Sequence, residues 1–258
     1  MTDQRDEQLK YFASVDHATR FKWQTEDPFV MEHEHAALIP FVQAVQVEEQ
    51  LHGSLRVLES GCGEGVNLVH LRQLGLSPER YELHGIDMST EAVAEAKRRG
   101  LPVESGDGLA LPYADASFDV SYCRDVLHHL ADDSERRKFF HEMWRVTKPG
   151  GLVGAIEPNP RNPGILALSY LVPAERGLLS MTEEHIQELL PGARVSRVAP
   201  SSVWRVLYHY RSPLRAIPLF AKVTRALSAA WDRLCSRGPG TMWSYRVYLW
   251  KKPERVSS

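Results

Sequence analysis

The hydrophobic positions along the chain alternate between short continuous runs and stretches with a helical period. The short runs have the length of buried strands, and they lie at 55–58, 81–87, 102–105, 118–123, 152–156 and 193–198. Several of the segments between them repeat apolar residues every three or four positions, as amphipathic helices do. This alternation of strands and helices predicts an α/β fold around a mostly parallel sheet.

Two segments interrupt this alternation. Residues 158–180 are rich in proline and apolar side chains and are expected to form an irregular insert beside the active site. Residues 199–242 separate the sixth strand from a last one at 243–250, where a short hairpin would suffice. The predicted organisation is a helical cap (1–50), a core (51–198), a helical insert (199–242) and a final strand with the tail (243–258).

Within the long insert, Ser212-Pro213 is predicted to begin a helix that runs to Ser236. Its apolar side chains share one face, and they are Ile217, Phe220, Val223, Leu227, Trp231 and Leu234. Its basic side chains lie opposite or beside them, and they are Arg215, Lys222, Arg225 and Arg233. A cationic amphipathic helix is typical of membrane interfaces, but it also fits a lid whose basic face is in water. We favour the lid as structure and keep peripheral membrane contact through 213–236 as a candidate interaction.

The most informative segment joins the first strand to the following helix, over residues 57–67. Glu59 is followed by glycines at 61, 63 and 65. Glycines let a loop turn sharply and let a ligand approach the backbone, and the helix start presents unpaired N–H groups. A dinucleotide site has the spacing G-x-G-x-x-G, whereas this chain has E-x-G-x-G-x-G. An acid before the first glycine would repel a diphosphate and pair well with an ammonium group.

The E-x-G-x-G-x-G segment resembles motif I of the class I S-adenosylmethionine (SAM)-dependent methyltransferases. Residues 106–119 are similar to the G-D-x-x-x-L-P-[FY]-x-x-x-S-F-D segment of that family. Leu127-His128-His129 resembles the L-H-H segment of its menaquinone and natural-product branch, and residues 148–151 resemble its K-P-G-G turn. The resemblance covers about residues 55–160. It implies SAM as the cofactor and a Rossmann-like, seven-stranded sheet with an antiparallel last strand between strands five and six and helices on both faces.

Asp87 ends the second predicted strand, roughly twenty residues past the glycine loop, where a carboxylate is placed to accept both hydroxyls of a ribose. By the resemblance, Asp107 accepts from the adenine amino group and Leu109 supplies a backbone contact, while Glu59 and the glycine loop serve the methionine end. The predicted cofactor-binding residues are Glu59, Gly61, Cys62, Gly63, Asp87, Met88, Asp107, Gly108, Leu109 and Arg124.

His128 and His129 follow the fourth predicted strand, and Glu157 ends the fifth. Ligands of open α/β sheets lie beyond the carboxyl ends of the strands, so all three residues are expected near the ligand. Histidine is suited to removing a proton near neutral pH. His128 or His129 is therefore the predicted catalytic base, with Glu157 as the orienting residue or second candidate. A structural role for one histidine fits the pattern equally well.

Charge is distributed unevenly along the 258 residues, although the net charge is only −2. From residue 193 onward thirteen Lys and Arg face two acids, which amounts to +11, so the preceding part carries −13. This asymmetry indicates an acidic catalytic body with a basic surface at one end.

No metal site is predicted. Cys62, Cys123 and Cys235 have neither metal nor disulfide spacing, which fits a reducing cytoplasm. His33 and His35 flank Glu34, but residues two apart do not share a helix face, and we expect both to be solvated. The charged N-terminus is no signal peptide, and no apolar run is long enough to span a bilayer.

These observations predict an enzyme that moves a methyl group from SAM to an oxygen of an apolar, lipid-like or secondary-metabolite acceptor. The alternatives are N- or C-methylation of a soluble metabolite, a SAM-binding module without catalysis, and a membrane-peripheral interaction protein. Residues 124–127 stand where an N-P-P-[YF] site for base amines would lie, which argues against nucleic acid, and the basic end alone is weak support for RNA. The sequence sets neither the acceptor atom nor the oligomeric state.

Overall fold

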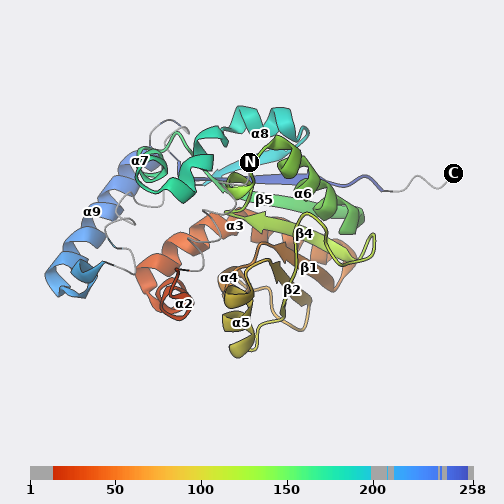
Figure 1. The fold of residues 1–258 in the computed structure, drawn as a ribbon, viewed down its shortest axis with the longest axis horizontal. Coiled ribbons are helices and arrows are strands. Elements are labelled where there is room, and N and C mark those ends of the chain that lie inside the picture. The colour runs from red at the N-terminus through yellow and green to blue at the C-terminus, as the bar shows by residue number, and fades with distance from the viewer. Residues whose placement is uncertain (1–13, 199–207, 209–211, 238, 240–242, 255–258) are drawn as a thin grey trace.

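The computed structural model describes residues 14–198, 208, 212–237, 239 and 243–254. Its centre is a seven-stranded sheet in the order β3-β2-β1-β4-β5-β7-β6 (Figure 1). The strands are β1 (Leu55–Ser60), β2 (Tyr81–Asp87), β3 (Val103–Ser105), β4 (Phe118–Arg124), β5 (Thr147–Pro158), β6 (Arg194–Val198) and β7 (Tyr245–Lys251). The first five pair in parallel, and β7 runs antiparallel to both β5 and β6. The predicted fold class and the position of the reversed last strand are confirmed.

Helices cover both faces of the sheet, as expected (Figure 1). One face carries α3 (Pro28–His52), α4 (Val66–Gln73) and α5 (Thr90–Arg98), and the other carries α6 (Asp133–Val146) and α8 (Glu183–Leu189). The larger apolar core joins the first group to the sheet, through side chains such as Phe41 and Leu68. A second core, with Phe139 and Ile186, lies under α6 and α8. The two cores fix the sheet rigidly, so its carboxyl edge is a firm base for a site.

Polar side chains begin several of the helices. Asp27 accepts a hydrogen bond from the N–H of Phe29 at 3.0 Å, and Ser89 accepts from Ala92 at 3.2 Å. Thr182 caps α8 in the same way, at 3.2 Å from the N–H of His185. Each side-chain oxygen satisfies an N–H group that the first helical turn leaves unpaired.

The region after β5 is more regular than expected. Residues 158–180 were predicted to be irregular, but they contain α7 (Pro163–Leu171) and a 3-10 segment, η2 (Pro173–Ser180). Asn162 explains the helix, because its side-chain oxygen accepts the N–H groups of Gly164 at 2.9 Å and Ile165 at 3.3 Å. The predicted turn at 148–151 lies within β5, where Gly150 has a φ of 77° and the pairing with β4 is shifted.

The helix of the long insert is confirmed, and its basic Lys222, Arg225 and Arg233 are in water as expected of a lid, but its apolar face is not the one that is buried. It consists of η4 (Pro213–Ala216) and α9 (Pro218–Ser236). Thr224 and Ser228 are the buried positions, whereas Leu219, Val223, Leu227 and Leu234 are 70, 46, 47 and 62% exposed. The helix therefore buries its short polar side chains and turns a large part of its apolar surface to solvent. Residues 199–207, 209–211, 238 and 240–242 of the insert and residues 1–13 of the cap lie outside the described residues, and the domain boundaries stay a prediction.

His33 and His35 are bonded within the protein, which corrects the expectation that both are solvated. His33 joins α3 to α9, because its Nε2 lies 3.0 Å from a carboxylate oxygen of Asp232. His35 lies 3.1 Å from the ring of His70. The insert is thus attached to the cap through a specific polar contact. Among the helices of the described part of the chain, none has the length and apolar character needed to cross a membrane.

Candidate active site

The glycine loop after β1 leaves open space on one side. Gly61, Gly63 and Gly65 have φ values of 81°, 51° and 76°, in the left-handed region that glycine adopts without strain. A Cβ on Gly61 would lie 2.5 Å from a methyl carbon of Val126, whereas a Cβ on Gly63 would meet nothing within 4 Å. The side chain of Val126 therefore packs against the loop at Gly61, whereas the space beside Gly63 is open. A ligand can approach the backbone at Gly63.

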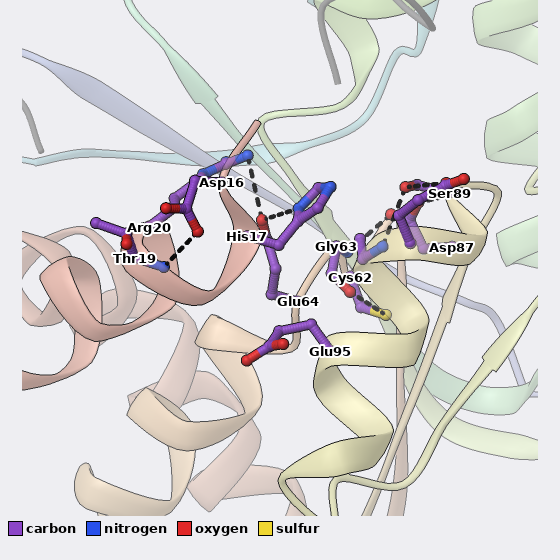
Figure 2. A network of polar contacts seen from close by, with 12 residues as sticks. Asp16, His17, Thr19, Arg20, Cys62, Gly63, Glu64, Asp87, Ser89 and Glu95 are labelled. Atoms are coloured by element: carbon purple, nitrogen blue, oxygen red, sulfur yellow. Dashed lines mark hydrogen bonds and ion pairs between the residues drawn. The ribbon is translucent and has the colours of Figure 1, made fainter. Parts of the chain in front are cut away.

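Asp87 at the end of β2 points at this loop (Figure 2). One carboxylate oxygen accepts the N–H of Gly63 at 2.7 Å, and the other accepts the N–H of Ser89 at 2.8 Å. Burial raises the pKa of Asp87. Two backbone donors hold the carboxylate in one orientation, and each oxygen keeps a lone pair for a ligand hydroxyl.

Glu59 lies under the loop and is fully buried. Its Oε1 accepts from the side-chain amide of Asn67 at 2.5 Å. Neither its Oε2 nor the nearby hydroxyl of Tyr122 has a hydrogen-bond partner of good geometry among the described residues. Burial raises the pKa of Glu59 to about 8. A buried carboxyl group with so few donors fits the ammonium group of SAM, which would restore the charged carboxylate.

The other predicted cofactor residues differ in which of their atoms a ligand could contact. Asp107 accepts the N–H of Leu109 at 2.9 Å, which shapes the turn around Gly108. Met88 is 47% exposed at the loop edge, beside Asp87. Cys62 packs its side chain against Gly85, so it can offer only its backbone to a ligand. Contact of these residues with SAM stays a prediction.

Arg124 is buried at the end of β4 and is tied to three neighbouring elements. It donates to a carboxylate oxygen of Glu34 and, at 2.9 Å, to the side chain of Asn67. Its guanidinium lies 5.2 Å from the ring centre of Tyr245. These contacts give Arg124 a structural role that links β4 to α3, α4 and β7, and the predicted cofactor contact is untested.

The histidine pair forms a short 3-10 turn, η1 (Leu127–His129), just beyond β4. Nδ1 of His128 lies 2.7 Å from Oε2 of Glu157, and its Nε2 lies 3.3 Å from a carboxylate oxygen of Glu175. The rings of His128 and His129 are 4.0 Å apart between centres. The structure therefore brings all three predicted catalytic residues together at the carboxyl edge of β4 and β5.

The charges of this cluster are strongly coupled. Burial alone would lower the pKa of His128, but Glu157 and Glu175 outweigh it and raise that pKa to about 10. Burial and the neighbouring charge of His128 lower the pKa of His129 to about 3. Burial alone would raise the pKa of Glu175, but the hydrogen bond and the charge of His128 outweigh it and lower that pKa to about 2. His128 is thus a cation and His129 a neutral imidazole at neutral pH.

Glu175 was not among the predicted site residues. It lies in η2, 47 positions after His128, and pairs with it only because the insert returns to the sheet edge. One sequence feature could have identified it, since Glu175 is the only acid between residues 158 and 180.

The N-terminal helix α2 (His17–Glu26) lies across the glycine loop (Figure 2). Nδ1 of His17 is 2.5 Å from a carboxylate oxygen of Glu64, and a nitrogen of Arg20 is 3.7 Å from the same atom. The guanidinium of Arg99, just after α5, lies 3.9 Å from the ring centre of Phe21. Burial would raise the pKa of Glu64, but the hydrogen bond from His17 outweighs it and the pKa is lowered. Part of the predicted cap thus covers the loop.

Comparison with known proteins agrees with this geometry. Residues 58–154 match the family described as Methyltransferase domain. The chain is 29% identical over 184 residues to a demethylmenaquinone methyltransferase of Mycobacterium sp. (strain KMS), covering 69% of this chain and 68% of that protein. It is 34% identical over 105 residues to a tRNA (carboxymethyluridine(34)-5-O)-methyltransferase of Arabidopsis thaliana, covering 41% of this chain and 24% of that protein. The predicted exclusion of nucleic acid is therefore not supported.

Solved structures share the fold along nearly the whole chain. A SAM-dependent methyltransferase from Archaeoglobus fulgidus is 19% identical, with a TM-score of 0.57 and coverage of 90% of this chain and 98% of that chain. The N-methyltransferase NodS from Bradyrhizobium japonicum, in complex with S-adenosyl-L-homocysteine, is 16% identical, with a TM-score of 0.55 and coverage of 98 and 100%. With the matching domain, the sheet order, the glycine loop and its two acids, the chain belongs to the class I SAM-dependent methyltransferases.

Proposed function

We propose that this enzyme transfers the methyl group of SAM to an oxygen atom of an apolar small molecule, with the histidine pair as the source of the catalytic base. The observation that carries the proposal is the cluster of His128, His129, Glu157 and Glu175. It lies beyond the ends of β4 and β5, next to the strand whose end carries the glycine loop. A donor at the loop and an acceptor at the cluster would be neighbours.

SAM supplies a methyl group that its positive sulfur has already activated for displacement. The protein must align acceptor and methyl group, which is worth roughly 7–11 kcal/mol in favourable cases. It must also exclude water and remove the proton of a hydroxyl acceptor, which contributes about two to four decades in rate. We assign the removal of the hydroxyl proton to the cluster.

Within the cluster, the two histidines are not equivalent. His128 directs both ring nitrogens at carboxylates, Glu157 on one side and Glu175 on the other. Its proton is held between two acceptors, which leaves His129, the neutral imidazole of the pair, as the candidate for the base, and its lowered pKa makes it a weak one. Glu157 then acts as the orienting residue of the pair.

The apolar nature of the acceptor is supported by surface on the two inserts. Large side chains are exposed on α7, where Tyr170 and Leu171 are 68 and 72% accessible, and along α9. In the view of Figure 1, α7 and α9 both appear toward the same end of the sheet. Arg215, Lys222 and Arg233 lie on the same insert, which suits peripheral contact of 213–236 with an anionic membrane. A cytoplasmic location is part of this proposal, and the relatives named as demethylmenaquinone methyltransferases support a small acceptor.

The test is methyl transfer from labelled SAM into a cell extract of the source organism, followed by separation into organic, aqueous and RNA fractions. We expect label in the organic fraction, lost with Asp87→Ala and strongly reduced with His129→Ala. His84→Ala is the matched control, because His84 lies on β2, two strands away from β4, and pairs with Glu82. Its activity should equal that of the wild type.

Other distributions of the label would replace the proposal. Label in the aqueous fraction would favour N- or C-methylation of a soluble metabolite. Label in RNA would favour the activity named for the Arabidopsis relative. Transfer to none of the fractions, with SAM binding shown by calorimetry, would indicate a non-catalytic SAM-binding module.

A further inference from the structure

Two segments far apart in the sequence bring three metal-ligating side chains together. His128 and His129 come from η1, and Glu175 comes from η2. One ligand atom from each lies within 4.8 Å of the others, and within the described residues this is the one such group of three. We propose that His128, His129 and Glu175 bind a divalent first-row transition-metal ion of the zinc type. This revises the expectation that the chain holds no metal.

The distances suit such an ion. Ligands at the usual 2.0–2.2 Å from a tetrahedral zinc ion are roughly 3.3–3.6 Å from one another. Nε2 of His128 and the carboxylate oxygen of Glu175 are already 3.3 Å apart. The ligand atoms of the three residues lie within 4.8 Å of one another, so closing to that spacing takes a movement of about 1 Å.

The donor set also suits this class of metal. Two imidazoles and one carboxylate bind zinc and its neighbours in the first transition row, whereas magnesium and calcium prefer oxygen ligands alone. Three protein ligands leave a fourth coordination position open, as in catalytic rather than structural zinc sites. The open position would be available to an acceptor oxygen.

Glu157 orients His128 through the ring nitrogen that does not face Glu175. Its Oε2 holds Nδ1 of His128 at 2.7 Å, and its Oε1 accepts the N–H groups of Val126 at 3.0 Å and Leu127 at 2.8 Å. A metal-bound histidine commonly donates its other ring nitrogen to a carboxylate, which fixes the tautomer and the ring. Here that carboxylate is anchored to the backbone of the same turn. Glu157 is a positioning residue whose bonds are in place without an ion.

The charges of the cluster also favour a divalent ion at this place. When the ion binds at Nε2 of His128, the proton held there has to leave, and Glu157 and Glu175 then carry two negative charges in a region of low exposure. Buried charges need compensation, and an ion of charge +2 supplies it.

The consequence for catalysis rests on the proposed function, although metal binding itself does not. An ion with an open position lowers the pKa of a hydroxyl bound there. The hydroxyl proton would leave to solvent before the methyl group arrives, and His129 would then serve as a ligand in place of a base. The cluster would still activate the acceptor oxygen.

The experiment uses full-length protein without a histidine tag, stripped with a chelator and titrated with Co²⁺ alone. We expect visible absorption bands of tetrahedral cobalt that saturate at one ion per chain and disappear when Zn²⁺ is added. Calorimetry with Zn²⁺ should show that His129→Ala and Glu175→Gln each weaken binding by at least about tenfold, and Glu157→Gln by about 10–100-fold. His84→Ala, on β2, should bind like the wild type. Circular dichroism would establish that each variant is folded.

Two results would overturn the proposal. One is the lack of a tetrahedral cobalt spectrum in the wild type, and the other is equal Zn²⁺ affinity in the wild type and a folded Glu175→Gln. Methyl transfer is measured in parallel on stripped protein. Transfer without metal binding would remove the metal site and leave the proposed function intact. Metal binding without transfer to any acceptor fraction would keep the metal site and remove the proposed function.

Discussion

The carboxylate of Glu157 bonds both to the ring of His128 and to the backbone of the turn that carries His128. One oxygen lies 2.7 Å from Nδ1 of His128, and the other accepts two N–H groups from the residues just before it. On the other side of the turn, Arg136 of α6 donates to the carbonyls of Leu127 at 3.0 Å and Leu130 at 3.2 Å. The backbone of the turn and the ring of His128 are therefore held by contacts within the protein on both sides.

Replacing Asp87 should weaken SAM binding with little effect on the acceptor site. Asp87→Asn removes the negative charge that two ribose hydroxyls would donate to, and a hydrogen bond to a charged group is worth about 1.5–3 kcal/mol. We expect the SAM dissociation constant to rise by roughly 10–150-fold. Calorimetry measures it, with Glu91→Gln on the exposed side of α5 as the control. An unchanged dissociation constant would remove Asp87 from the cofactor site.

Two glycines of one loop should respond differently to the same substitution. A Cβ on Gly61 would collide with Val126 at 2.5 Å and also sit at a φ of 81°, so Gly61→Ala should lower the free energy of unfolding by about 2–4 kcal/mol. Gly63→Ala meets open space and should cost only about 1–2 kcal/mol of backbone strain. Because that space is where SAM is expected, Gly63→Ala should impair SAM binding more than stability. Denaturant unfolding with parallel calorimetry checks both, and equal effects of the two variants would contradict this account.

Glu59 should make the ligand-free protein less stable as pH rises. Its pKa is about 8 in the folded protein, against a usual value of 4.5, so the folded state binds its proton more tightly than the unfolded state. The stabilisation is complete below pH 4.5 and is lost as pH rises through 8. Glu59→Gln cannot ionise, so its unfolding free energy should exceed that of the wild type at pH 9, with a difference on the order of 2–5 kcal/mol relative to pH 5.

The measurement for Glu59 is urea unfolding at several pH values without ligand, followed by SAM calorimetry. Glu59→Gln should bind SAM more weakly although it is more stable, because it has lost the partner for the ammonium group. Parallel pH curves for the two proteins would show that Glu59 does not have the raised pKa.

Removing the contact between α2 and the glycine loop should accelerate SAM release. His17→Ala deletes the 2.5 Å contact with the carboxylate of Glu64, which attaches α2 over the loop. A partly buried contact of this kind is worth about 1–2 kcal/mol, so the dissociation rate should rise by roughly 5–30-fold. Stopped-flow displacement measures the rate. His84→Ala, which removes an exposed His–Glu contact on β2, is the matched control, and an equal rate in all three proteins would separate α2 from ligand release.

The sequence by itself determined the order of strands, the glycine loop and the positions of Glu59, Asp87 and the histidine pair. These features are local. A buried strand is visible as an apolar run, and a left-handed turn as a glycine, so neither depends on distant residues. The parallel topology then places the carboxyl ends of β1, β4 and β5 at one edge, which made His128, His129 and Glu157 predictable as neighbours.

Only the tertiary structure decided which distant groups complete the site. Glu175 reaches His128 across 47 positions, Arg124 pairs with Glu34 across 90, and His17 reaches Glu64 across 47. It also decided that α9 buries Thr224 and Ser228 while its leucines face solvent. A periodic pattern tells which residues share a helix face, but the surface that receives the helix determines which face is buried. That surface is built by segments far away in the chain.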